Sequence, residues 1–399
     1  MSRMTKVSAA ENALEELLSG LNPQQRAAAS HDQRPLLIVA GAGTGKTTTL
    51  AHRVANLIAR GIDPGRILLL TFTRRSSAEM LRRVDALLTR WRNQAAKLQS
   101  GVAAGTDLQP DVKLDADRSA AAGIPIRTAQ AALSTRDIWG GTFHAVATRL
   151  LRQHGKLIGL EPDFTIVDRA DAEDLLNAIR SELELAKTDK RFPLKGTCLD
   201  IYSRVVNTQL PLERVLKESF PWVVDQLDGL KKLFAAYTER KEQQQTLDYD
   251  DLLLFWHGLV TEPSCGEIVR QKFDCVLVDE YQDTNTLQAE IVRGLVPDGR
   301  GLTVVGDDAQ SIYSFRAASV RNILDFPQQF PGTTVLPLEQ NYRSTQPILA
   351  ATNQIIALAK EGHRKELWSN RETGNPPQLV SCQDETEQTD YVIAQILAH

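Results

Sequence analysis

A glycine-rich segment at residues 40–47 has the composition of a phosphate-binding loop. It reads Ala-Gly-Ala-Gly-Thr-Gly-Lys-Thr, with alanine where the strict pattern begins on glycine, and it separates an apolar run from a helical pattern. Glycines let consecutive backbone N–H groups surround a phosphate, Lys46 would reach the β and γ phosphates, and the Thr47 hydroxyl would bind Mg²⁺. A merely flexible turn is the alternative. We predict nucleotide binding by Ala40, Gly41, Ala42, Gly43, Thr44, Gly45, Lys46, Thr47 and Thr48.

Two adjacent acids, Asp279 and Glu280, end the apolar run Val276-Leu277-Val278. At the carboxyl end of a strand beside a phosphate loop, Asp279 can hold Mg²⁺ through its water shell, and Glu280 can polarise an attacking water. Without that loop, two adjacent acids would indicate only a solvated turn.

A third polar segment follows the apolar residues Val304 and Val305, and it contains Gln310. A glutamine at this place can hydrogen-bond both a γ phosphate and the water that attacks it. Taken alone, Gln310 would be an ordinary loop residue.

Short apolar runs must position these residues. They are bounded by glycine or polar residues and cover 36–40, 67–72, 275–278, 302–305 and 335–338. Runs of this length suit parallel strands that are buried on both faces. Between the first two, Leu50, Val54, Leu57 and Ile58 recur at helical spacing. The pattern predicts a doubly wound α/β sheet.

Two other regions have a different character. Residues of about 94–134 are rich in Ala, Gly and Gln, which predicts a surface insertion. Residues of about 165–260 are helical by pattern, which predicts a helical subdomain inserted between strands of the sheet.

Composition excludes several classes of protein. The 399 residues carry a net charge of -4, so any nucleic acid or membrane would have to be held by a local patch. The chain has no apolar run long enough to span a membrane and no signal-peptide pattern, which predicts a cytoplasmic protein without a membrane partner. Its four cysteines lie far apart, which argues against a disulfide scaffold, a zinc ribbon or an iron–sulfur cluster.

Eight sequence blocks occur in a specific order: LNPQQRAA, AGAGTGKT, LLLTFTRRSSAEM, GTFHAVATRLLR, LDYDDLLL, VLVDEYQDTN, VVGDDAQSIYSFRAA and LEQNYRS. In order and approximate spacing, this set resembles the UvrD/Rep/PcrA-like superfamily 1 DNA helicases. The resemblance spans about residues 20–398. It implies a RecA-like P-loop NTPase core, an inserted helical subdomain and the start of a second RecA-like domain.

The resemblance also implies ATP with Mg²⁺ as cofactors and assigns roles at the nucleotide. Gln25 resembles the glutamine that reads adenine, Tyr342 the aromatic that stacks on adenine, and Arg343 the arginine that meets the γ phosphate. Thr48 stands where many members carry arginine, so one contact is expected to be absent. The predicted catalytic residues are Lys46, Asp279, Glu280, Gln310 and Arg343, and the predicted metal ligands are Thr47 and Asp279.

For DNA, the resemblance implies backbone contacts from hydroxyls and a histidine, and base stacking on aromatic faces. The predicted residues are Thr71, Phe72, Thr73, Thr142, Phe143, His144 and Phe315. Without the family, Phe72 and Phe143 would be core residues and His144 a structural histidine. The arginine runs at 74–92 and 149–152 are interpreted either as solvated helix faces or as part of a DNA channel.

The resemblance predicts an N-terminal extension at 1–19, an ATP-binding domain at 20–345 and the beginning of a second RecA-like domain at 346–399, apparently truncated. It implies a 3′ to 5′ helicase that acts on single-stranded DNA and on single/double-strand junctions, with repair or replication proteins as further partners. Because motifs expected after residue 399 are missing, we expect this chain to bind ATP–Mg²⁺, to hydrolyse ATP slowly and not to unwind duplex. A nucleotide- or DNA-binding interaction module and the helicase part of a recombination helicase-nuclease are the alternatives.

Overall fold

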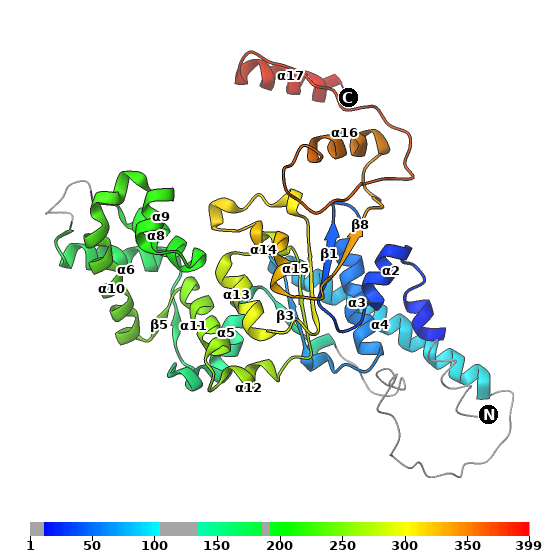
Figure 1. Cartoon of the computed structure of the whole chain (residues 1–399), viewed down its shortest axis with the longest axis horizontal. Coiled ribbons are helices and arrows are strands. Elements are labelled where there is room, and N and C mark those ends of the chain that lie inside the picture. The colour runs from blue at the N-terminus through cyan, green and yellow to red at the C-terminus, as the bar shows by residue number, and fades with distance from the viewer. Residues whose placement is uncertain (1–11, 104–134, 186–191, 399) are drawn as a thin grey trace, which may run out of the picture.

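A six-stranded parallel sheet forms the centre of the molecule in the computed structural model, which describes residues 12–103, 135–185 and 192–398 (Figure 1). The strand order is β3-β2-β6-β7-β1-β8. The strands are β1 (Leu36–Ala40), β2 (Ile67–Leu70), β3 (Trp139–Gly141), β6 (Cys275–Val278), β7 (Leu302–Gly306) and β8 (Thr334–Leu338). The predicted α/β class with a parallel sheet is confirmed.

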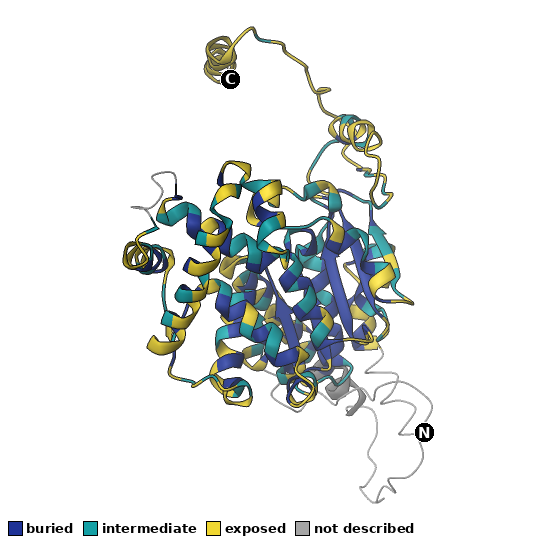
Figure 2. Cartoon of the chain, turned by 60° about the vertical axis from the view of Figure 1, so that its left-hand side comes forward, coloured by how far each residue is buried: buried dark blue, intermediate teal, exposed yellow. Residues whose placement is uncertain are grey.

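The four inner strands β1, β2, β6 and β7 are buried on both faces, as their continuous apolar runs predict, whereas the edge strand β8 is partly exposed (Figure 2). In β1, Leu37 and Val39 belong to one hydrophobic cluster, whereas Leu36, Ile38 and Ala40 belong to the other. Successive side chains of a strand point to opposite faces, so one run supplies both cores.

Helices cover both faces. One cluster joins the sheet to α2 (Pro23–Ser30), α3 (Lys46–Ala59) and α4 (Arg74–Ala103). The other joins it to helices that come later in the chain, namely α5 (Phe143–His154), α11 (Tyr249–Thr261), α12 (Gly266–Arg270), α13 (Thr286–Leu295), α14 (Arg321–Leu324) and α15 (Phe326–Gln329). All six strands are parallel, so their carboxyl ends share one edge, where the phosphate loop also lies.

The region predicted as a helical subdomain contains α6 (Arg169–Glu182), α8 (Lys195–Thr208), α9 (Leu212–Ser219) and α10 (Leu227–Gln244). Figure 1 shows these green helices to one side of the sheet. The sequence did not predict its two-residue parallel strands, β4 (Thr165–Ile166) and β5 (Thr246–Leu247). Its apolar residues are continuous with one face of the main sheet.

Two further regions bear on the predicted boundaries. Helix α4 runs to Ala103, so it covers the start of the predicted insertion at 94–134, and residues 104–134 lie outside the described residues. Residues 1–11 of the predicted N-terminal extension also lie outside them, whereas Leu14 and Leu17 belong to the hydrophobic cluster that includes the buried residues of α3. After β8 come α16 (Gln346–Ile356) and α17 (Glu385–Ala398), which are largely exposed (Figure 2).

Short 3-10 helices shape the loops at the strand ends. Those used below are η3 (Gly155–Ile158), η4 (Pro221–Gln226), η5 (Tyr281–Asp283), η6 (Asp308–Gln310) and η7 (Ser314–Arg316). Within the part of the chain that the structure describes, no helix combines the length and apolar character required to cross a bilayer.

Candidate functional site

The phosphate loop connects β1 to α3 and requires glycine at two positions. Gly43 and Gly45 have φ of +84° and +86°, in the left-handed region that favours glycine. A Cβ atom on Gly43 would lie 2.7 Å from Arg343 Cβ, and one on Gly45 would lie 2.6 Å from Gln25 Nε2. The glycines thus allow both the turn and the close approach of two predicted ATP-binding residues.

Gln25 is buried against this loop. Its side-chain Nε2 donates to the Thr44 carbonyl at 2.9 Å, while its Oε1 accepts from Asn22 N at 3.2 Å. The second bond belongs to a capping box in which Asn22 caps α2. The start of α2 and the phosphate loop are therefore held together through the glutamine predicted to read adenine.

Lys46 and Glu280 meet where α3 faces the end of β6. Lys46 Nζ lies 2.8 Å from Glu280 Oε2, and the lysine and glutamate side chains are 11% and 32% exposed. Glu280 has a φ of 51°, which is uncommon for a residue with a side chain and is often found at functional sites. The two residues predicted to contact phosphate and to activate water form one ion pair in this structure.

Negative charge exceeds positive charge around this pair. Burial, followed by the charge of Glu280, raises the pKa of Asp279 to about 7. The same two causes raise the pKa of Asp283 to about 6, and its buried Oδ1 has no hydrogen-bond partner. Lys46 alone does not compensate three carboxylates, so this donor set fits a cation. Mg²⁺ prefers oxygen ligands and keeps several waters, and Asp279 with Thr47 would hold it here.

Gln310 lies in η6, after β7, the neighbouring strand. Its Nε2 donates to Asp307 Oδ2 at 2.6 Å, and Asp307 N donates to Gln282 Oε1 at 3.0 Å. Gln282 Nε2 in turn donates to Glu280 Oε2 at 3.0 Å. The predicted sensor and the predicted base thus belong to one hydrogen-bond network, through a glutamine that sequence reasoning missed.

Tyr342 and Arg343 follow β8, on the other side of β1. Asn341 Nδ2 donates to the Ala42 carbonyl at 2.6 Å, and Tyr342 N donates to the Gly43 carbonyl at 2.9 Å. The half-exposed Tyr342 ring and the exposed Arg343 side chain thus stand at the rim of the phosphate loop. At Thr48, where the family pattern often has arginine, Arg83 Nη1 from α4 donates to the hydroxyl at 3.2 Å.

Three aromatic rings gather at the ends of β2 and β7. Phe72 and Tyr313 have ring centroids 4.9 Å apart, and Tyr313 and Phe315 lie 5.8 Å apart. Phe315 is 69% exposed and Phe72 is 37% exposed, and the Arg316 guanidinium lies 5.6 Å from the Phe315 ring centroid. We call Phe72, Tyr313 and Phe315 the aromatic surface. Exposed aromatic rings next to an arginine can stack on bases without reading their sequence. Tyr313, which sequence reasoning did not single out, bridges the two predicted rings.

Family models match almost the whole chain. The model of the UvrD/REP helicase N-terminal domain matches residues 21–331, and that of the UvrD-like helicase C-terminal domain matches residues 336–399. The chain belongs to the UvrD/Rep helicase family. The second match begins within β8, inside the range 20–345 predicted for the ATP-binding domain.

Curated relatives support the same assignment. The ATP-dependent DNA helicase PcrA of Leuconostoc citreum is 34% identical over 385 residues, covering 96% of this chain and 45% of the relative. The ATP-dependent DNA helicase UvrD1 of Mycobacterium tuberculosis is 36% identical over 374 residues, covering 90% of this chain and 42% of the relative. PcrA of Bacillus subtilis is 34% identical over 363 residues, covering 90% of this chain and 42% of the relative. The chain therefore spans less than half the length of these relatives.

Two residues that the helicase motifs predict to contact DNA have buried side chains. Phe143 is only 5% exposed and packs on Trp256 with ring centroids 5.9 Å apart. Thr71 is 1% exposed, and its hydroxyl donates to the Thr73 carbonyl at 3.0 Å. Both side chains are core residues in this structure and present almost no exposed surface to DNA, so their contact with DNA stays a prediction. For Phe143 this is the alternative weighed from sequence; the sheet and α11 close over the ring.

The other predicted DNA residues lie at helix starts. Thr73 Oγ1 accepts from Ser76 N at 3.0 Å, and Thr142 Oγ1 accepts from Ala145 N at 3.3 Å. His144 packs edge-on to Tyr249 at 5.7 Å, and burial lowers its pKa to about 4. At neutral pH this histidine is therefore uncharged and could meet a phosphate only as a hydrogen-bond donor.

The arginine runs divide between the two interpretations. Arg82 and Arg83 pair with Glu79, and the Arg149 guanidinium lies 3.6 Å from the Trp139 ring centroid. These contacts are structural. Arg74 and Arg75, in contrast, are exposed at the start of α4, next to Phe72.

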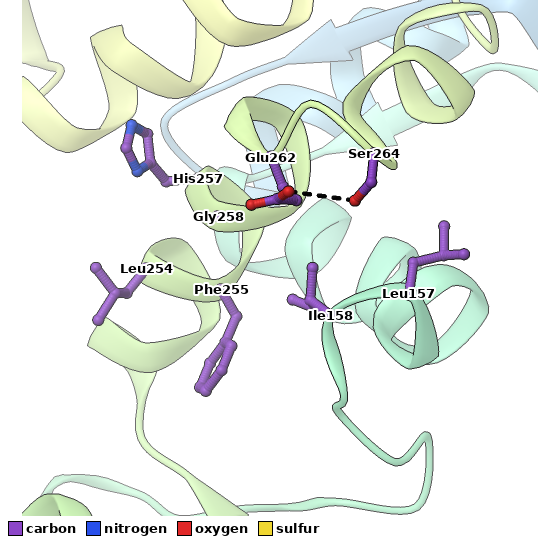
Figure 3. Close-up of a pocket in the computed structure, with 8 residues that line it drawn as sticks. All are labelled: Leu157, Ile158, Leu254, Phe255, His257, Gly258, Glu262 and Ser264. Atoms are coloured by element: carbon purple, nitrogen blue, oxygen red, sulfur yellow. Dashed lines mark hydrogen bonds between the residues drawn. The ribbon is translucent and has the colours of Figure 1, made fainter.

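A surface cavity of about 540 Å³ lies between η3 and α11 (Figure 3). Its lining is mostly apolar, with His257 and Glu262 as its titratable residues. None of the residues predicted to bind ATP or DNA lines it. This cavity is therefore separate from the candidate nucleotide and DNA sites, which are distinguished by charge and backbone geometry.

Proposed function

We propose that this chain binds ATP with Mg²⁺ and single-stranded DNA, and that it hydrolyses ATP as the nucleotide-binding part of a 3′ to 5′ DNA helicase. The observation that carries the proposal is the Lys46–Glu280 ion pair of 2.8 Å, where the phosphate loop meets the end of β6. A lysine for phosphate and a carboxylate for water lie within one contact of each other, and the membership in the helicase family agrees with this chemistry.

The ion pair suggests how nucleotide binding starts catalysis. When bound through Thr47 and Asp279, Mg²⁺ would neutralise charge on the phosphates. Lys46 would leave Glu280 for the phosphate oxygens, which compete strongly for an ammonium group. Glu280 would then be free to accept a proton from water, while Gln310 orients that water and Arg343 meets the γ phosphate. Gln25 and Tyr342 would hold the adenine.

The aromatic surface suggests how ATP chemistry reaches DNA. Gln310 and the rings of Tyr313 and Phe315 belong to the single loop that follows β7. A shift of Gln310 on hydrolysis would therefore move the rings of Tyr313 and Phe315, because only a few backbone residues separate them from Gln310. Stepping along one strand, displacement of the other at a junction, and work alongside repair or replication proteins are proposals for the whole helicase.

ATP turnover with and without an oligodeoxythymidine strand tests the nucleotide part. We expect DNA to stimulate turnover and Lys46→Ala to reduce kcat by about 10²–10³-fold, the cost of losing one preorganised electrostatic donor. Failure of the unmodified chain to bind ATP–Mg²⁺ would contradict the proposal. Binding of both ligands without any turnover would favour the interaction-module alternative.

Phe315→Ala tests the DNA part. Losing one stacked base costs about 1–3 kcal/mol, so we expect single-strand affinity to fall by about 5- to 150-fold. Trp222→Ala is the matched control, because Trp222 is an aromatic residue of η4 that is 74% exposed and lies outside the aromatic surface. Equal losses in the two variants, measured by fluorescence anisotropy, would count against stacking at Phe315.

A further inference from the structure

The chain turns back onto the sheet after α16. We call residues 361–371 the return segment. Asn341 N donates to the Trp368 carbonyl at 2.7 Å, and Trp368 N donates to the Glu339 carbonyl at 3.0 Å, which forms a parallel bridge beside the end of β8. A Cβ atom on Gly41 would lie 2.9 Å from a methyl carbon of Leu367. The return segment therefore lies against the phosphate loop.

One lysine of this segment is buried among acids at the sheet edge. Lys365 Nζ lies 2.5 Å from Asp307 Oδ1 and 3.3 Å from Asp308 Oδ1. The lysine side chain is 4% exposed, and the two aspartates are 5% and 10% exposed. An ammonium group is costly to bury unless it is paired, and its removal would leave two nearly buried carboxylates without their cation.

Asp307 connects this lysine to the catalytic set. Its Oδ1 is held by Lys365 and by Ala309 N at 3.1 Å, while its Oδ2 accepts from Gln310 Nε2 at 2.6 Å. A carboxylate with both oxygens occupied in this way cannot rotate freely. The orientation of the Gln310 amide therefore depends on the anchor at the other oxygen.

We propose that Lys365 is a positioning residue for ATP hydrolysis: through Asp307 it orients Gln310, and it does so only while the return segment lies on the sheet edge. The proposal rests on the proposed function for its effect on turnover. Lys365 falls within the match to the C-terminal helicase domain, whereas Asp307 and Gln310 fall within the match to the N-terminal one. One family domain thus supplies a positioning group to the ATP site of the other.

The test compares Lys365→Met with Lys360→Met, which makes the same change at an exposed lysine in the same part of the chain. We expect Lys365→Met to lower kcat by about tenfold, the lower end of what loss of a supporting group behind a site residue costs. The dissociation constant for ATP–Mg²⁺ should change little, and Lys360→Met should resemble the unmodified protein. An unchanged kcat in Lys365→Met would overturn the proposal.

A second pair of variants separates positioning from general damage to the fold. If Lys365 acts through Gln310, adding Lys365→Met to Gln310→Ala should lower kcat no further, because coupled residues are not additive. A further tenfold loss in the double variant would show that Lys365 acts by another route and would overturn the proposal.

Hydrogen exchange gives a readout that does not depend on turnover. The Ala309 amide is expected to exchange faster in Lys365→Met, because its acceptor Asp307 Oδ1 has lost its anchor, and to be unchanged in Lys360→Met. Unchanged exchange at Ala309 would overturn the proposal. An unmodified chain that lacks ATP turnover would instead contradict the proposed function, and the exchange result would still decide whether Lys365 orders this loop.

Discussion

Two lysine–carboxylate clusters in this chain have similar composition but differ in whether their charges are compensated. We call Lys241, Asp248 and Asp251 the closed cluster, and Lys46, Asp279, Glu280 and Asp283 the open cluster. In the helical subdomain, Lys241 Nζ lies 2.7 Å from Asp248 Oδ2 and 2.6 Å from Asp251 Oδ2, with the three side chains at most 6% exposed. The same ammonium group lies 4.9 Å and 4.3 Å from the ring centroids of Tyr202 and Tyr237. Burial opposes its charge, but the carboxylates outweigh burial and raise the pKa of Lys241.

The cluster at the phosphate loop is open by comparison. Lys46 has one carboxylate partner, Glu280, whose side chain is 32% exposed and whose backbone is left-handed. Burial raises the pKa of Asp279 and Asp283, as it also raises the pKa of Asp251 in the closed cluster, but among the described residues only the open cluster has a buried carboxylate oxygen, Asp283 Oδ1, without a hydrogen-bond partner. The closed cluster is complete within the fold, whereas the open one has unmet charge that a ligand could satisfy. This difference marks the functional site more clearly than residue type does.

Breaking the closed cluster should have the largest effect. Lys241→Met leaves two buried carboxylates unpaired, so we expect the free energy of unfolding to fall by about 3–5 kcal/mol. Lys232→Met, at an exposed lysine on the same helix, is the control. Chemical denaturation measures both. If Lys241→Met lowered the free energy of unfolding no more than Lys232→Met does, the closed cluster would not stabilise the fold.

Removing unmet charge from the open cluster should stabilise the protein in the absence of nucleotide. The folded-state pKa of Asp279, about 7, lies above its ordinary value of 3.8, so its protonated form favours the native state and stability declines as pH rises from about 4 through 7. Asp279→Asn lacks this decline. We expect it to be more stable than the parent at pH 8 by about 2 kcal/mol, roughly half of a full conversion of the shift, and the advantage to vanish near pH 4.

The control for this change is Asp225→Asn, at an exposed aspartate in η4, measured over the same pH range. If Asp279→Asn were no more stable than this control at pH 8, the comparison of the two clusters would fail on its central point. ATP with Mg²⁺ should narrow the difference, because the cation would then compensate Asp279 in the parent.

The smallest expected effect on stability belongs to Lys46→Ala. Lys46 is only 11% exposed, but the Glu280 side chain is 32% exposed, so water can solvate the carboxylate that loses its partner. We therefore expect the free energy of unfolding to fall by about 1 kcal/mol, the upper end for solvent-accessible ion pairs. A thermal melt without nucleotide measures this value. A loss as large as that of Lys241→Met would mean that the loop lysine is structural and that the two clusters are alike.

The sequence predicted five of the six main strands because each is a continuous apolar run. It missed β3 (Trp139–Gly141), whose two glycines hide it from a hydrophobic pattern, although its backbone pairs with Leu68 to Leu70. Helix α4 continues to Ala103, into the surface insertion predicted at about 94–134, because its Ala- and Gln-rich end lacks the periodicity that would have indicated a helix. Local spacing therefore identified the strands that carry the site. It missed β3, which is formed by backbone pairing, and the end of α4, whose residues show no helical periodicity.

Among the site residues, sequence order placed the phosphate loop, the acid pair and Gln310 on neighbouring strand ends. It did not separate Phe72, which is exposed, from Phe143, which is buried, since both follow short strands in similar motifs. It also missed Tyr313, Gln282 and Lys365. Each of these acts through a contact across a loop or across the sheet.

The sequence alone determined the family and the parallel α/β core, and it predicted the chemistry of the nucleotide site, because these depend on residues close together in the chain and on their order. Tertiary structure alone decided which charges are satisfied. Lys46 and Glu280 are separated by 234 positions, and Lys365 and Asp307 by 58. Whether such a pair is closed, open or dependent on another segment is set by packing and by access to water, which no local pattern contains.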